Sequence, residues 1–254
     1  MIYFVDESRF ADLKNFCKMQ TIYSCRIMCL ADSYGLNFDF VQFWLQYDEN
    51  GNIVSAISKS YGDVTVQTTE KSIISELTEF LDVIGFCSLL SEKMLFENRT
   101  ADTGIIMCLE NPQKIYNSDI EVTVNPDLNS VYKLLDKNRS EKFNVPDYED
   151  FILDMSHKIR HNTAICTAIK IGENVVSASI TVAQSENTAL IGAVVTDIDF
   201  RRRGFGALCV NSLIEILGNR KIFIMRDENE NEPFYKSLGF ENNGRFYIFG
   251  GKNE

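Results

Sequence analysis

Apolar and polar positions along the 254-residue chain follow the same order of elements twice. In each copy a turn rich in asparagine and glycine, at 48–52 and at 171–174, leads into a strand that contains Val-Ser-Ala. A second apolar strand follows, then a helix with apolar residues spaced three and four apart, then a further strand. These elements are predicted at 64–68 and 189–196, at 73–84 and 206–218, and at 87–96 and 221–225. We therefore predict a diverged duplication.

The pattern is interrupted near the centre of the chain. Residues 110–127 are polar apart from one short strand candidate at 120–124, and they contain two of the four prolines. The sequence therefore predicts an N-terminal domain at 1–111, a linker at 112–125 and a C-terminal domain at 126–254. Each domain is expected to be an α/β (α+β) unit, with a mixed sheet flanked by helices.

Composition limits the class of protein. Hydrophobic residues make up 45% of the chain, enough for a folded core. The apolar runs are shorter than the roughly 20 residues of a membrane span. Residues 1–6 predict a strand and do not resemble a signal peptide. The seven cysteines are odd in number and scattered, which is typical of reduced thiols. We expect a cytoplasmic protein without membrane partners.

The formal net charge of −11 changes the expected partners. General nucleic-acid binding needs a basic face, so this charge argues against it. It favours cationic substrates through electrostatic steering. An acidic surface that keeps the protein soluble explains the same charge.

The stretch 201–207, Arg-Arg-Arg-Gly-Phe-Gly-Ala, lies between the apolar run 190–196 and the predicted helix. Glycines let the backbone approach a ligand, and the first N–H groups of a helix are unpaired and electropositive. The stretch therefore predicts a site for a phosphate ester, with a pyrophosphate as the nearest match. The corresponding stretch of the first copy, 66–72, has no glycine and one cation, so it is not expected to bind the same ligand.

Two motifs together resemble a known family. Arg201-x-x-Gly204-x-Gly206, after the approach 195–200, is similar to the signature of the GNAT superfamily of acyl-CoA N-acyltransferases. The aromatic pair and Gly-Phe within 233–240 are similar to the family's C-terminal signature. The resemblance covers 126–254, while 1–111 resembles the fold only in element order. It implies a tandem protein with an intact C-terminal copy, a degenerate N-terminal copy and mostly antiparallel sheets.

The resemblance also implies a ligand, a reaction and site residues. The co-substrate would be acetyl-CoA, and Tyr235 would be the general acid for the leaving thiolate. The oxyanion would be bound by the N–H of Val195 or Thr196. The base stays open among Asp197, Glu186, Asp227 and a water chain. The expected coenzyme-binding residues are Val194, Val195, Thr196, Arg201, Arg202, Arg203, Gly204, Phe205, Gly206, Ala207, Asn229 and Asn231.

Alternatives remain open for several of these residues. Tyr235 is equally explained as a packing aromatic beside Phe234. His157 and His161 have the four-residue spacing of metal ligands, but no third ligand is suggested and no metal is expected. The same helix is also a candidate wall of the acceptor channel.

The predicted function is transfer of an acetyl group from acetyl-CoA to a primary amine of a small molecule or a protein. The alternative is a non-catalytic acyl-CoA sensor or scaffold, and a nucleotide-binding module is a third hypothesis. The acceptor, the base and the oligomeric state are not predicted.

Overall fold

The computed structural model describes residues 1–110, 119–140, 143–228 and 230–251. The chain forms two compact units. Unit 1 contains Met1–Met107, Met225–Asn231 and Asn242–Glu254, and unit 2 contains Cys108–Ile224 and Glu232–Glu241. The predicted boundaries at 111 and 126 stay a prediction, because part of the linker, 111–118, lies outside the described residues.

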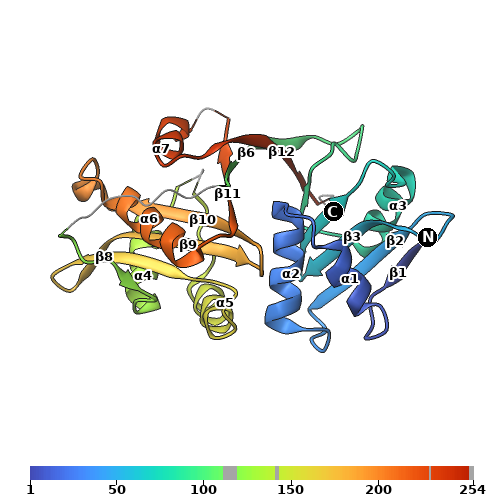
Figure 1. Ribbon diagram of the computed structural model, residues 1–254, viewed down its shortest axis with the longest axis horizontal. Coiled ribbons are helices and arrows are strands. Elements are labelled where there is room, and N and C mark those ends of the chain that lie inside the picture. The colour runs from blue at the N-terminus through green and yellow to red at the C-terminus, as the bar shows by residue number, and fades with distance from the viewer. Residues whose placement is uncertain (111–118, 141–142, 229, 252–254) are drawn as a thin grey trace. The chain divides into compact units, whose positions relative to one another are not determined.

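Unit 1 is a sheet with helices on both faces (Figure 1). Its strands follow the order β1-β2-β3-β4-β5-β12-β6. The pairing of β4 with β5 is parallel, and the pairings β1–β2, β2–β3, β3–β4 and β5–β12 are antiparallel. The elements are β1 (Ile2–Phe4), α1 (Phe10–Phe16), α2 (Ile22–Tyr34), β2 (Val41–Tyr47), β3 (Ile53–Ser60), β4 (Asp63–Thr68), α3 (Ile74–Ile84), β5 (Ser88–Ser91), β6 (Ala101–Leu109) and β12 (Glu241–Gly250).

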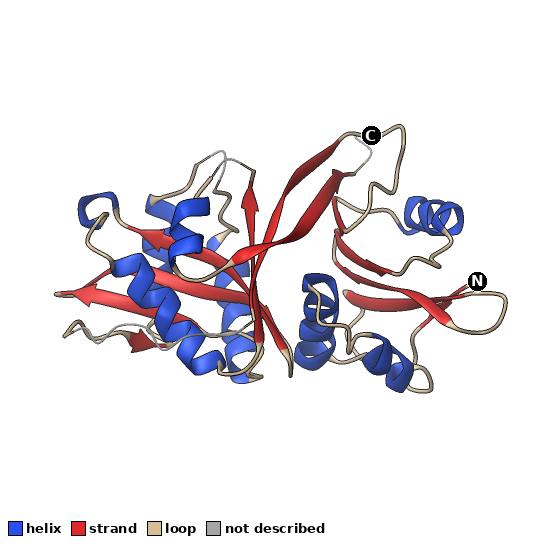
Figure 2. Cartoon of the chain, turned by 45° about the horizontal axis from the view of Figure 1, so that its top comes forward, coloured by secondary structure: helices blue, strands red, loops and turns tan. Residues whose placement is uncertain are grey.

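Unit 2 repeats this plan (Figure 2). Its strands follow the order β11-β10-β9-β8-β7, with β10–β11 parallel and the other pairs antiparallel. The elements are β7 (Thr123–Val124), α4 (Leu128–Lys137), α5 (Tyr148–Arg160), β8 (Cys166–Ile171), β9 (Asn174–Gln184), β10 (Thr188–Thr196), the 3-10 helix η1 (Ile198–Phe200), α6 (Phe205–Leu217), β11 (Lys221–Asp227) and α7 (Glu232–Ser237). The division between the units falls within β11, after Ile224.

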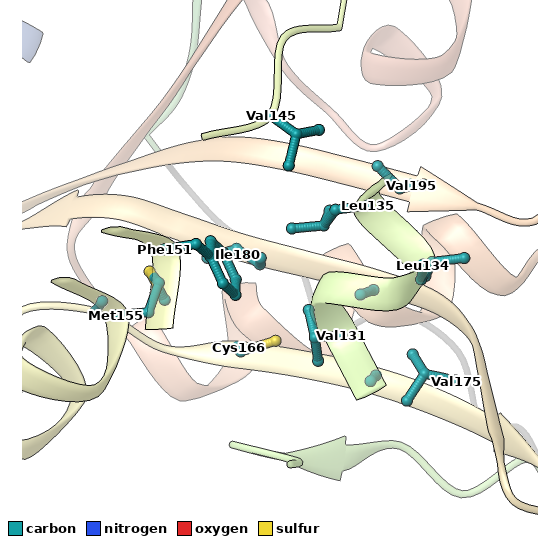
Figure 3. Packing of buried hydrophobic residues seen from close by; sticks show 13 residues of the cluster. Val131, Leu134, Leu135, Val145, Phe151, Met155, Cys166, Val175, Ile180 and Val195 are labelled. Carbon is teal, nitrogen blue, oxygen red and sulfur yellow. The ribbon is translucent and has the colours of Figure 1, made fainter. Parts of the chain in front are cut away.

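The core of unit 2 shows why the sheet takes helices on both faces. Neighbouring residues of a strand point to opposite faces. Ala178 and Ile180 of β9 therefore pack against α4 and α5, where Val131 and Phe151 lie (Figure 3). Val176 is two residues from Ala178 but packs with the opposite cluster, which contains Phe205 and Cys209 of α6, because the pairing of β8 with β9 shifts register beside it, between Ile169 and Lys170. The sheet of unit 2 thus holds α6 on the face away from α4 and α5.

The predicted fold class is confirmed: both units are mixed α/β arrangements with mostly antiparallel sheets, as expected for a tandem protein. The repeated strands and helices appear near their predicted bounds. The strand predicted at 87–96 is shorter, because β5 ends at Ser91 and the chain then leaves the ladder to bury Leu95 and Phe96 in the core. No helix in the described residues is long and apolar enough to cross a membrane. All the cysteines are free thiols, and Cys87 is the exposed one.

Candidate functional site

The end of β10 is the first part of the candidate site. Residues Thr188–Ile191 pair with β11, whereas 193–196 pair with β9 alone among the described residues. The change comes at a β-bulge around Gly192. A Cβ added to Gly192 would lie 2.2 Å from a methyl carbon of Val182, so only glycine fits there. The bulge leaves one edge of the last residues of β10 open.

Hydrogen-bond alternation decides which backbone groups lie on that edge. The Asp197 N–H donates to the Val176 carbonyl over 2.9 Å, so the backbone of Val195 also faces β9. The N–H groups of Val194 and Thr196 therefore point to the open edge. The Val195 side chain is buried in the core of unit 2. Of the two N–H groups predicted for the oxyanion, that of Thr196 has the suitable direction.

The start of α6 is the second part of the site. Gly204 precedes the helix in the left-handed conformation, with φ of 82°, and has no side chain to cap it. The Leu208 N–H donates to the Gly204 carbonyl over 3.0 Å, so the N–H groups of Phe205, Gly206 and Ala207 precede the first helical bond. A Cβ on Gly206 would lie 3.3 Å from Thr196 Oγ1. The start of α6 thus packs closely against the end of β10.

Helix α6 differs in this respect from two other helices of the chain. Thr21 caps α2 by accepting from the Ser24 N–H, and Asp127 caps α4 by accepting from the Ser130 N–H. At α6 a cap of this kind is replaced by glycine. The N-terminal N–H groups of α6 can therefore receive an anion from outside the protein.

The three predicted arginines differ in their contacts. Arg201 donates from Nε to the Thr196 carbonyl over 3.0 Å and from a terminal nitrogen to Asn138 Oδ1 over 3.1 Å. Arg203 donates to the Asp199 carbonyl over 3.0 Å. Arg202 is exposed at φ of 63° and has no polar contact within the described residues. The geometry leaves Arg202 as the cation available to a ligand.

Asp197 follows β10 and is held as an anion. Its carboxylate lies 2.6 Å from Lys137 Nζ and accepts from the Asp199 N–H. The hydrogen bond from Lys137 is the main cause that lowers the pKa of Asp197. A lowered pKa makes this carboxylate a weak base, which disfavours Asp197 as the group that deprotonates an amine.

The other two candidate bases lie elsewhere. Glu186 is exposed in the turn before β10, about 30 Å from Thr196 at the strand rise of roughly 3.3 Å per residue. Asp227 is exposed and belongs to unit 1. Glu186 is therefore far from the open edge of β10, and Asp227 is not part of unit 2.

Tyr235 lies on α7, next to the start of α6. Its neighbour Phe234 would be 3.8 Å from a Cβ on Gly206. The Tyr235 ring packs edge-on against Phe234 and Phe240, at 5.0 and 6.0 Å between centroids. Burial raises the pKa of Tyr235 to about 12, and its hydroxyl has no hydrogen-bond partner in the described part of the chain. The hydroxyl is therefore a protonated donor with a free hydrogen.

The remaining predicted residues are separated or not described. Asn231 is exposed in unit 1, with φ of 58°, and Asn229 lies outside the described residues. The His157 and His161 rings stack at 4.3 Å. Over the ranges that the structure describes, no group of three or more His, Cys, Asp or Glu residues could hold a metal ion.

Three polar residues of the site were missed by the sequence reasoning. Lys137 and Asn138 contact the segment 197–201 from the end of α4, and Ser177 Oγ lies 2.9 Å from Thr196 Oγ1. Each is a common residue type in an unremarkable position, with no motif around it. Only the pairing of distant segments brings them to the site.

Comparison with known proteins agrees with this geometry. Residues 128–240 match the Acetyltransferase (GNAT) family. A comparison with curated proteins found no match.

Solved structures that share the fold extend over both units. A Drosophila protein has a TM-score of 0.67 at 11% identity, over 100% of this chain and 99% of that one. A GCN5-related N-acetyltransferase from Sphaerobacter thermophilus has a TM-score of 0.59 at 12% identity, over 98% and 94%. A tandem GNAT protein from the clavulanic acid biosynthesis pathway has a TM-score of 0.57 at 10% identity, over 100% and 99%.

The family match and the fold define the class of protein. Residues 128–240 form a GNAT acetyltransferase domain within a tandem GNAT fold, so the predicted resemblance is confirmed. The enzyme class predicted from the resemblance, an acyl-CoA N-acyltransferase of the GNAT type, agrees with the family match over residues 128–240.

Proposed function

We propose that this protein transfers the acetyl group of acetyl-CoA to a primary amine. The observation that carries the proposal is the glycine-capped start of α6 directly beside the open edge of β10. Unpaired N–H groups and the helix dipole favour the coenzyme diphosphate there, and Arg202 adds a cation. A bound pyrophosphate can approach this backbone because Gly204 and Gly206 carry no side chains.

The open edge of β10 supplies the other contacts. The Val194 N–H and carbonyl suit the amides of the pantetheine arm, which would extend the sheet as a strand does. The Thr196 N–H is the proposed donor to the oxyanion. Val195 supports this edge from the core, and Arg201 and Arg203 support the loop.

The proton transfers set the demands on the site. Deprotonating an alkyl ammonium of pKa about 10.4 at pH 7 costs about 4.6 kcal/mol. The base for this step is proposed to be a water chain, since Asp197 is engaged by Lys137. Tyr235, at a pKa of about 12, is a weaker acid than an exposed phenol. Its proton transfer to a thiolate of pKa about 8.5 is uphill by about 5 kcal/mol, so it must be concerted with departure of the thiolate.

The high pKa of Tyr235 also favours a second candidate, a protein that binds acetyl-CoA without turnover. The change Tyr235→Phe separates the two. In an enzyme that uses this acid, kcat should fall by about 100-fold while the dissociation constant of CoA stays the same. In a sensor, both the wild type and the variant should bind CoA and form no product.

The direct test is an acyl-transfer screen by mass spectrometry over small-molecule amines, polyamines, amino acids and peptide N-termini. The expected product is an amide about 42 Da heavier than the amine, because an acetyl group replaces one hydrogen. The acidic composition favours a cationic acceptor in the cytoplasm, and no nucleic-acid or membrane partner is proposed. Binding of ATP or NAD in place of CoA would overturn the proposal.

A further inference from the structure

Two polar bridges connect the end of α4 to the segment between β10 and α6. The first runs from Lys137 Nζ to the Asp197 carboxylate over 2.6 Å, and that carboxylate also accepts from the Asp199 N–H. The second runs from Asn138 Oδ1 to the Arg201 guanidinium over 3.1 Å. Because Asp197 and Arg201 flank η1, the two bridges hold both ends of this turn.

The second bridge continues to the open edge of β10. Arg201 Nε donates to the Thr196 carbonyl over 3.0 Å, while Asn138 Nδ2 donates to the Leu134 carbonyl of α4 over 2.8 Å. The Thr196 side chain is fixed separately, because its hydroxyl lies 2.9 Å from Ser177 Oγ. The carbonyl and the side chain of Thr196 are therefore both held in place, and its N–H points to the open edge.

We propose that Lys137 and Asn138 are positioning residues, which act through Asp197 and Arg201 to keep the Thr196 N–H and the start of α6 in the geometry that receives acyl-CoA. This inference rests on the proposed function for its ligand. The physical reason is preorganisation: a loop held before binding loses less conformational entropy when the ligand arrives. The motif predicted that Arg201 faces the coenzyme. In this arrangement its side chain instead connects Asn138 to the Thr196 carbonyl.

The position of Lys137 and Asn138 at the end of α4 has a further consequence. Lys137 ends α4, and Asn138 begins the segment that leads to α5. The helix end and the coenzyme loop are therefore mechanically linked within unit 2.

The test uses the full-length protein with CoA as the probe. Lys137→Met and Asn138→Ala should each weaken CoA affinity, and the double variant by about tenfold, a factor that corresponds to one charge-assisted hydrogen bond. Isothermal titration calorimetry gives the affinity. Hydrogen exchange in the ligand-free protein should show faster exchange of the hydrogen-bonded N–H groups of Asp197, Phe200 and Arg201 for both variants, with unchanged protection of α5.

Matched variants separate positioning from general stability. Lys133→Met removes a charge from an exposed position on the same helix and should leave affinity and exchange unchanged. Lys137→Arg keeps the cation, and Asn138→Asp keeps an oxygen for Arg201 while losing the donor to Leu134. Both conservative variants should retain the wild-type affinity to within about twofold.

Two results would contradict different statements. If the wild type binds CoA and both Lys137→Met and Asn138→Ala bind it equally well, with unchanged exchange in 196–207, the positioning role is wrong. If the wild type does not bind CoA, the proposed function fails. The exchange measurement on the ligand-free protein still decides whether Lys137 and Asn138 order the segment 196–207.

Discussion

The strand-to-helix junctions of the two units begin alike and end differently. In unit 1 the parallel pairing of β4 with β5 covers Asp63–Val66, and in unit 2 that of β10 with β11 covers Thr188–Ile191. Each strand then continues beyond its parallel neighbour towards a helix, α3 or α6. The shared pattern places an electropositive helix start beside a strand end in both units.

In unit 1, side chains of the protein pair with N–H groups of the turn before α3. Ser72 Oγ accepts from the Thr69 N–H over 2.8 Å, and Gln46 Oε1 accepts from the Ile73 N–H over 3.2 Å. The Glu76 carboxylate in the first turn of α3 accepts from Gln46 Nε2 over 2.8 Å. The last residues of β4, including Gln67, are buried. The junction of unit 1 thus pairs N–H groups of its turn with side chains, and its first helical turn contains the Glu76 carboxylate, which also lies 2.9 Å from the N-terminal amine.

If the coenzyme binds as proposed, a strand, a turn and a helix are not sufficient for its site. The donors must also be unpaired and the turn must lack bulk. Unit 2 has an uncapped helix start behind Gly204 and Gly206. In unit 1 helix α3 also has no side-chain cap, but the turn before it has no glycine, and side chains pair its Thr69 and Ile73 N–H groups. Four substitutions test this comparison.

The largest effect is expected from the strand that completes unit 1. In β12, Phe249 is fully buried beside Phe96, and the strand pairs with Leu89 and Leu90 of β5. Phe249→Ala should lower the free energy of unfolding by about 3–5 kcal/mol, measured by urea titration. Phe38→Ala, at a residue 45% exposed, is the control and should change it far less. Equal effects would contradict the placement of β12 in unit 1.

The next effect concerns the side chains that close the unit 1 junction. Gln46 is buried and contacts Ser55, Ile73 and Glu76. Gln46→Ala should destabilise the protein by about 1–3 kcal/mol, because partners of a buried amide are left unpaired. The affinity for CoA should not change. Gln42→Ala, on the more exposed part of the same strand, is the control. A gain of a second CoA site would mean that closure alone separates the two junctions.

A smaller effect is expected for the cations of the two junctions. Arg202→Ala should weaken CoA binding by about fivefold, the scale of one solvent-exposed ion pair, with little change in stability. Lys71→Ala removes the single cation of the stretch 66–72 and should have no effect on binding. Calorimetric titration at low and high salt checks both, since screening should reduce the effect at Arg202. Equal losses would place the coenzyme elsewhere.

The smallest effect is a dependence of stability on pH. Lys137 lowers the pKa of Asp197 below its unfolded value, so the folded state gains stability above the unfolded pKa and loses it as pH falls through the folded pKa. Between about pH 5 and pH 2, stability should therefore fall less steeply in Asp197→Asn than in the wild type. The exposed Asp150→Asn is the control. Parallel curves for the wild type and Asp197→Asn would show that the ion pair does not stabilise the fold.

Local sequence patterns predicted the fold and the loop that we propose binds the coenzyme. The spacing of apolar residues located α3 and α6, and the glycine pattern of 204–206 located the start of α6. Choices among distant partners could not be predicted, because they depend on pairing across the chain. Thus β12 joins unit 1, and Arg201 turns to Thr196 and Asn138. The pKa of Tyr235 depends on its burial between two rings, which the sequence does not show.

The position of β12 bears on how the protein is made. Residues 242–250 are translated after the whole of unit 2, yet they form a strand beside β5 in unit 1. During synthesis the edge of β5 that pairs with β12 stays unpaired until residues 242–250 have been translated. The large sequence separation between β5 and β12 raises the contact order of unit 1, so we expect this unit to be completed slowly.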